Sequence, residues 1–147
     1  MQAVVDYAIR GDAEAVEMPR RDAVARMEAA PTAAAMLTLH ATHLREIHER
    51  SSRIASTVEQ AANGDASMAE LWKRMNHNRG VGIRWATDTF LAKPGRKAGM
   101  SRTHVEAVFW VALNWGTFRT LTEQAGLNAD SYESWLRSYY RSMLLAR

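Results

Sequence analysis

The sequence predicts an all-helical protein, and two observations support this class. Over most of the chain apolar residues recur at intervals of three and four, the periodicity of amphipathic helices, and no stretch shows the alternation of a half-buried strand. Only 3 prolines and 8 glycines interrupt the 147 residues, so the segments between them are long enough for helices. We therefore expect one domain, residues 1–147, of about six or seven helices around a single core.

Composition narrows the class of protein further. Hydrophobic residues make up 47% of the chain and charged residues 24%, which is ordinary for a packed globular protein. The net charge of +3 is too small to indicate nucleic-acid binding by itself. The absence of cysteine excludes disulfides, thiolate zinc sites and cysteine nucleophiles. No apolar run approaches the roughly 18 residues of a membrane span. We expect a cytoplasmic protein that does not enter a membrane.

Two short segments open the chain. Residues 1–9 are expected to form a short helix, or the end of a longer one, which Gly11 closes. A brief helix is predicted over residues 21–28, and Pro31 ends it because proline disrupts a helix interior.

A long apolar stripe follows, from Thr32 to the helix-stop signal Asn63-Gly64. Ser51 and Ser52 mark a point where this segment could divide into two helices. The stripe consists of Met36, His40, His43, Leu44, Ile47, Ile54, Val58 and Ala61.

The next helix is predicted to begin at the capping box Ser67-Met-Ala-Glu70, in which the hydroxyl and the carboxylate satisfy exposed amides of the first turn. Proline and glycine then predict a loop over residues 93–99. The apolar stripe of this helix consists of Met68, Leu71, Trp72, Met75, Arg79, Gly82, Ile83, Ala86 and Phe90.

A helix capped by Ser101 follows the loop. Its centre, residues 105–113, is apolar on every side apart from Glu106, which is typical of a helix covered on two faces. Residues 114–117 are expected to bend it, and Gly126-Leu127 to end it.

The final helix is predicted to open with a second capping box, Asp130-Ser-Tyr-Glu133. Its apolar stripe consists of Tyr132, Trp135, Leu136, Tyr139 and Met143.

The order and lengths of these helices, with several short phrases, resemble the C-terminal domain of the TetR family of transcriptional regulators. The likeness covers nearly the whole chain and is clearest over residues 105–145. The phrases are Phe109-Trp110, Asn114-Trp115, Gly126-Leu127, Tyr132-Glu133 and Trp135-Leu136, preceded by Ala69-Glu70-Leu71-Trp72-Lys73-Arg74 and Arg79. The resemblance implies a helical bundle that binds a small-molecule effector and forms a homodimer through its last two long helices.

One feature departs from the family. Members begin with a three-helix DNA-binding head, whereas nothing before Thr32 matches a helix-turn-helix, and residues 1–10 resemble the end of the helix that joins head to body. DNA would therefore be contacted only through an N-terminal domain that this sequence lacks. The resemblance implies a repressor, in which a ligand that prefers one arrangement of the helices moves the linker helix and releases the DNA.

The resemblance places an effector between the helices of residues 36–47, 71–90 and 105–114. Such pockets are mostly apolar with a few orienting polar groups, and the many aromatic residues favour a small apolar or aromatic ligand. The candidate ligand-binding residues are Met36, His40, His43, Leu44, Ile47, Trp72, Met75, Asn76, Arg79, Phe109, Trp110, Leu113 and Asn114.

Charged and titratable candidates leave alternatives open. A guanidinium at Arg79 that faces a core needs a protein carboxylate or an acidic ligand, unless only its methylenes are buried and the charge reaches solvent. His40 and His43 share a helix face, with His48 one turn beyond, so metal binding is conceivable. Zinc needs further ligands that the sequence does not supply. We expect satisfied core or pocket histidines, with no metal or cofactor.

The resemblance also implies a two-fold interface built by the last two long helices. Alternatively, the same side chains fill the subunit's own core, and the pattern does not decide which face of the last helix points outward. The candidate interface residues are Val108, Val111, Trp115, Phe118, Tyr132, Trp135, Tyr139 and Met143.

Catalysis is not expected. The chain has no cysteine, no Gly-x-Ser-x-Gly elbow, no glycine-rich phosphate loop and no paired carboxylates on one core face. Two alternatives to a regulator remain: a stand-alone helical small-molecule-binding or adaptor protein, and a helical metal-dependent enzyme that uses His40, His43 and a carboxylate.

Overall fold

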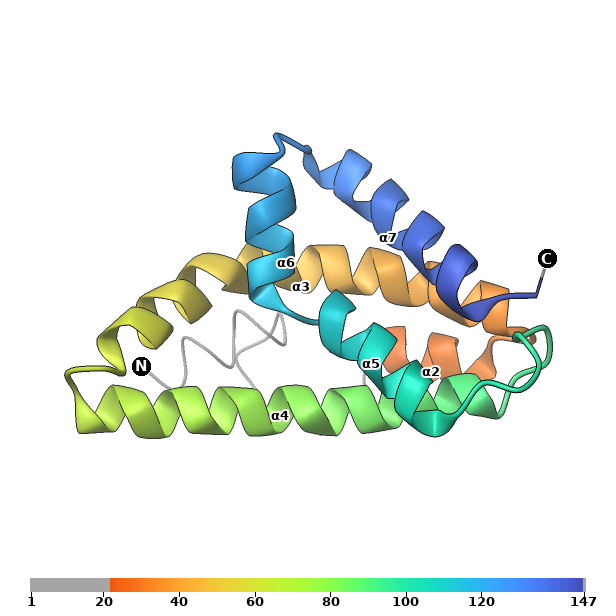
Figure 1. Ribbon diagram of the computed structural model, residues 1–147, viewed down its shortest axis with the longest axis horizontal. Coiled ribbons are helices and arrows are strands. Elements are labelled where there is room, and N and C mark those ends of the chain that lie inside the picture. Colours follow the sequence, from red (N-terminus) through yellow and green to blue (C-terminus); the bar gives the residue numbers. More distant parts are fainter. Residues whose placement is uncertain (1–21, 147) are drawn as a thin grey trace.

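Two long helices form the frame of the computed structural model, which describes residues 22–146 (Figure 1). α3 (Ala33–Ala61) and α4 (Ala66–Leu91) are joined by a short turn and pack side by side in opposite directions. α2 (Asp22–Ala29) packs against α3. Every regular element in this part of the chain is a helix, which confirms the predicted all-α class. The helix predicted over residues 1–9, and the linker remnant assigned to residues 1–10, lie outside the described residues.

The remaining helices cover this frame. α5 (Arg102–Ala112) packs on α4, and α6 (Trp115–Arg119) packs on α3. A π-helical turn (Thr120–Gln124) extends α6, and α7 (Ala129–Leu144) then returns across α3 and contacts α5 (Figure 1). The predicted bend after residue 113 is confirmed as a break between α5 and α6, capped by Asn114. None of the described helices has both the length and the apolar character needed to span a membrane.

The two helices predicted from capping boxes exist, but in both cases the residue that caps the helix is not the one predicted. The Asp65 carboxylate caps α4, accepting hydrogen bonds from the amides of Ser67 at 2.8 Å and Met68 at 3.1 Å. Asn128 caps α7 in the same way, accepting from the Ser131 amide at 2.8 Å. A carboxylate at the start of a helix also meets the positive end of its dipole, which favours Asp65 over the Ser67 hydroxyl. Ser101 caps α5 as predicted.

Ser51 and Ser52 do not divide α3, which is one continuous helix. The Ser51 hydroxyl donates a hydrogen bond to the Ile47 carbonyl at 2.7 Å, so the serine is accommodated within the helix. This type of bond to the preceding turn often bends a helix, and α3 curves towards its C-terminal end in Figure 1.

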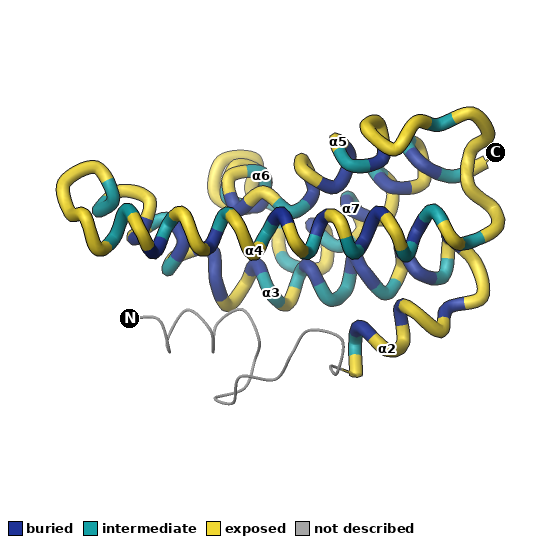
Figure 2. The backbone as a smooth tube through the Cα atoms, turned by 90° about the horizontal axis from the view of Figure 1, so that it is seen from below, coloured by how far each residue is buried: buried dark blue, intermediate teal, exposed yellow. Residues whose placement is uncertain are grey.

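The buried apolar residues form two clusters. The larger lies between α2, α3, α5, α7 and the second half of α4, and includes Met36, Phe90, Phe109 and Leu136. The smaller lies where the end of α3 meets the start of α4 and α6, around Trp115. Figure 2 shows the buried positions of α3 and α4 concentrated where the two helices face each other. The candidate site residues are distributed over both clusters.

Candidate functional site

The structure divides the candidate ligand-binding residues between two places. One group lies in the larger core cluster or against it: Met36, His40, Leu44, Phe109 and Leu113. His43 and Ile47 are half-buried on α3. The other group lies where α4 meets α5 and α6, and consists of Trp72, Met75, Asn76, Arg79, Trp110 and Asn114.

His40 is a satisfied core histidine. It is 5% exposed, and its Nδ1 shares a 2.8 Å hydrogen bond with the hydroxyl of Tyr140 on α7. Its ring also packs edge-on against Phe109, with the centroids 5.3 Å apart. Burial, assisted by electrostatic interaction with His43 and His48, lowers the pKa of His40 to about 3. The imidazole is therefore neutral at pH 7 and is engaged within the subunit.

His48, eight residues further along α3, makes the same kind of contacts. Its Nδ1 shares a 2.8 Å hydrogen bond with the Tyr132 hydroxyl, and its ring packs against Phe118 at 5.4 Å. Burial, with the charge of Arg79, lowers the pKa of His48 to about 3, although a hydrogen bond that the imidazole donates to the Leu113 backbone carbonyl opposes this. Within residues 22–146 no group of three or more His, Asp or Glu side chains is placed to hold a metal ion.

Arg79 is the most unusual residue of the second group. Its guanidinium carbon lies 5.2 Å from the ring centroid of Trp110 on α5 and 5.3 Å from that of Trp115 on α6. Its Nε is buried and has no hydrogen-bond partner. Burial lowers the pKa of Arg79, and the distant Glu59 carboxylate only partly opposes this. A cation held between two indoles is stabilised by the negative faces of their rings, but an unpaired donor remains.

The two indoles differ in depth. Trp115 is 7% exposed, and its Nε1 donates a 2.9 Å hydrogen bond to the Ser51 hydroxyl of α3. Trp110 is 42% exposed and forms the outer wall. We name this cluster of Arg79, Trp110 and Trp115 the arginine–indole junction. Because its members come from α4, α5 and α6, any movement between these helices changes its geometry.

Two glycines of α4 lie beside α5. A Cβ on Gly80 would meet the Trp110 ring at 3.8 Å, and one on Gly82 would meet Leu113 at 3.9 Å. Both are ordinary contact distances, so an alanine would fit at either position without moving α5. Neighbouring amides serve local structure: Asn76 Nδ2 donates to the Trp72 carbonyl at 3.0 Å, and Asn114 Oδ1 accepts from the Gly116 amide at 2.7 Å.

Sequence reasoning assigned Trp115 to a dimer interface and missed its contact with Arg79. The signal that could have found it is Asn114. An asparagine followed by a helix-compatible run is a strong N-cap, and a new helix starting at Trp115 turns its indole back towards α4.

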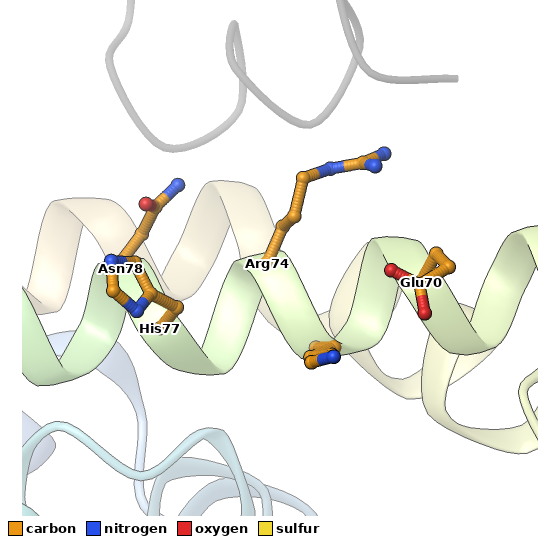
Figure 3. A pocket seen from close by; sticks show the side chains of 5 residues that line it. Glu70, Arg74, His77 and Asn78 are labelled. Atoms are coloured by element: carbon orange, nitrogen blue, oxygen red, sulfur yellow. The ribbon is translucent and has the colours of Figure 1, made fainter.

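A shallow hollow of about 370 Å³ lies along the outer face of α4 (Figure 3). The described residues that line it all come from this single helix and are exposed: Glu70, Lys73, Arg74, His77 and Asn78. None of the candidate ligand-binding residues belongs to it. Because its described lining is exposed and includes no predicted ligand-binding residue, we do not regard this hollow as the effector site.

The candidate interface residues also divide. Val108, Trp115, Phe118 and Tyr132 are buried within the subunit, Tyr132 completely, so these side chains fill the subunit's own core. This is the alternative that the sequence left open for them. The residues that keep accessible surface are Val111, which is 46% exposed, and the half-buried Trp135, Tyr139 and Met143.

Comparison with known protein families, curated proteins and solved structures finds no match for the chain. Its function is therefore inferred from the residues described above.

Proposed function

We propose that the chain is the effector-binding and dimerisation domain of a TetR-type transcriptional regulator, a repressor that contacts DNA through a separate N-terminal head. The helix order in residues 22–146 and the phrases around Trp72, Trp110 and Trp135 support this proposal. The arginine–indole junction is the observation that carries it. It joins a cation with an unused donor to an exposed aromatic surface, a combination that suits a small aromatic or apolar effector with a polar group.

The position of the junction suits signalling between helices. A ligand that touches Trp110 and Arg79 contacts α5 and α4 at once. Trp115, the first residue of α6, transmits any displacement to α3 through its hydrogen bond with Ser51. A ligand with different affinities for two arrangements of these helices shifts the balance between them. In the proposed regulator, that shift moves the DNA-binding heads of the dimer.

The proposed dimer uses the accessible side chains of α5 and α7. Trp135 and Tyr139 stack nearly parallel, with ring centroids 5.2 Å apart, and the Tyr139 hydroxyl donates to the Val108 carbonyl at 3.3 Å. The aromatic stripe of α7 therefore adjoins α5, whose Val111 is exposed one turn beyond Val108. Aromatic and apolar side chains of this kind are enriched at the centres of subunit interfaces.

A thermal-shift panel of small aromatic and apolar compounds tests the effector proposal. A compound that binds only the folded chain raises its melting temperature in proportion to the logarithm of its concentration. We expect at least one such compound, and we expect Trp110→Ala to abolish the rise. Val81→Ala, which removes a comparably exposed apolar side chain of α4, is the control and should retain it. A panel in which no compound raises the melting temperature would contradict the proposal. Binding by a strictly monomeric chain would favour a stand-alone binding protein.

A further inference from the structure

Arg79 has no counter-ion among residues 22–146. Among the described residues, ion pairs are made by Arg45, Arg102, Arg119 and Arg137, and no carboxylate lies within ion-pair distance of Arg79. Arg45 shows the usual arrangement for a half-buried arginine in this chain, since Glu49 and Glu133 both bond to it. A partly buried guanidinium with an unsatisfied Nε is costly, so an anion there would be strongly stabilised.

Two acidic side chains near the junction along the helices are engaged elsewhere, and Glu70, nine residues before Arg79, makes no ion pair with it. Asp88 of α4 and Glu106 of α5, which lies one turn before Trp110, both bond to Arg102, at 2.7 Å and 2.9 Å. Glu59 acts on Arg79 only through space, without a contact. The chain therefore supplies no carboxylate to the junction from these positions.

A second arginine borders the same place. Arg84 Nη1 lies 3.5 Å from the point that a Cβ on Gly80 would occupy, and Trp110 Cη2 lies 3.8 Å from that point. Arg84 is exposed and makes no ion pair with any described residue. Two guanidinium groups thus approach the exposed indole of Trp110, and the local potential there is positive.

We propose that Arg79 and Arg84 bind the carboxylate of a small planar acid whose apolar body stacks on the exposed face of Trp110. This inference rests on the proposed function, because it names the ligand class of the same site. The planar guanidinium of Arg79 offers paired N–H donors that match the two oxygens of a carboxylate. A singly charged carboxylate fits a partly buried site better than a doubly charged phosphate, since less charge is removed from water.

Titration with 2-naphthoate, followed by tryptophan fluorescence and calorimetry on the full chain, tests this inference. 2-Naphthamide is the neutral control of the same shape, and acetate is the control without a ring. We expect naphthoate to bind about tenfold or more tightly than naphthamide, because a charge-assisted bidentate contact is lost in the amide. Acetate should bind more weakly than naphthoate, because it cannot stack. Added salt should weaken naphthoate binding more than naphthamide binding.

Variants identify the residues responsible. Arg79→Gln should remove the preference for the acid, and Arg79→Lys should restore part of it, since lysine keeps the charge without the planar fork. Arg84→Gln, at an exposed position that the fold does not need, should weaken naphthoate binding about threefold. Arg141→Gln removes the same charge from the exposed face of α7 and should change nothing. If Arg79→Gln does not fold, Arg84→Gln and the acid–amide comparison still decide the matter.

The results also separate this inference from the proposed function. Failure of naphthoate to bind below about 10 mM, equal affinity for acid and amide, or unchanged binding in both Arg79→Gln and Arg84→Gln would overturn the inference. A dimeric chain that bound neutral compounds alone would reject the inference and leave the regulator proposal standing. A monomeric chain that bound naphthoate through Arg79 would support the inference and reject the regulator.

Discussion

His40 and His48 are each held by one tyrosine of α7, and these two pairs are the buried polar contacts between α3 and α7. Tyr140→Phe removes the partner of His40 and leaves its buried Nδ1 unsatisfied. We expect this variant to lose about 1–3 kcal/mol of unfolding free energy, measured by urea denaturation. Tyr139→Phe is the matched control: its hydroxyl is half-buried with a longer 3.3 Å bond, so the loss should be smaller. Equal losses in the two variants would contradict this account of His40.

Burial of the same two histidines should make the unfolding free energy sensitive to acid. Burial lowers the pKa of both to about 3, whereas the unfolded chain keeps values near 6.5. Between these values the unfolded state binds protons that the folded state does not. The unfolding free energy should therefore fall as pH falls from about 6.5, by up to about 1.4 kcal/mol per pH unit for each histidine. Above about pH 6.5 the two histidines should not change the unfolding free energy with pH.

Denaturation curves between about pH 7 and about pH 5 measure this slope before most carboxylates titrate. His104→Gln, which changes an exposed histidine at the start of α5, should preserve the slope. A wild-type stability that stays flat over this range would show that the two imidazoles are not sequestered.

At the scale of elements, one carboxylate fastens α7 to α3. Glu133 accepts hydrogen bonds from the Thr42 hydroxyl at 2.8 Å and from Arg45 Nε at 2.9 Å, and it also pairs with Arg137. Burial opposes its ionisation, but the hydrogen bonds from Thr42 and Arg45 and the charge of Arg137 lower the pKa of Glu133 overall. The ionised form is therefore the one that holds the helices together.

Glu133→Ala should cost about 1–2 kcal/mol of unfolding free energy, because hydrogen bonds from two helices end on this side chain. Glu123→Ala breaks an exposed ion pair with Arg119 at 3.5 Å and should cost less than about 0.5 kcal/mol. Thermal or urea unfolding of the two variants gives the comparison. If Glu123→Ala lost as much unfolding free energy as Glu133→Ala, the hydrogen bonds between α3 and α7 would stabilise the fold no more than an exposed ion pair does.

The helices themselves could be predicted from apolar spacing, because that spacing reports which side of a helix faces a core. Their first residues could not. Near α4 both Asp65 and Ser67 are capping types, and the choice depends on which side chain reaches the free amides. Glu133 was assigned to a capping box because the pattern sees only local partners. Its actual partners lie on α3, far away in the sequence.

At the scale of the whole molecule, the sequence indicated candidate binding residues but did not show which of them are satisfied within the core and which keep an unused donor. His40 and Arg79 both lie on apolar stripes, yet one is satisfied by Tyr140 and the other has an unused Nε. What separates them is which helix crosses above each position, and apolar spacing carries no information on crossing angles. The break at Asn114, which places Trp115 over Arg79, was anticipated only as a bend.

The surface proposed for the dimer yields a matched pair of variants. Val111 of α5 and Val81 of α4 are similarly exposed, at 46% and 39%. A glutamate buried without a partner at a subunit interface is strongly unfavourable. Val111→Glu should therefore shift the chain towards the monomer, whereas Val81→Glu should not. Dissociation by Val81→Glu alone would place the interface on α4 instead.

The molar mass of the purified chain in solution, measured by light scattering over a dilution series, tests the central claim most directly. An effector-binding domain that positions two DNA-binding heads must pair with a second copy. We predict a mass twice the 16.5 kDa of one chain, falling towards 16.5 kDa in the Val111→Glu variant. A wild-type mass of 16.5 kDa at every concentration would contradict the assignment of this chain to a dimeric regulator.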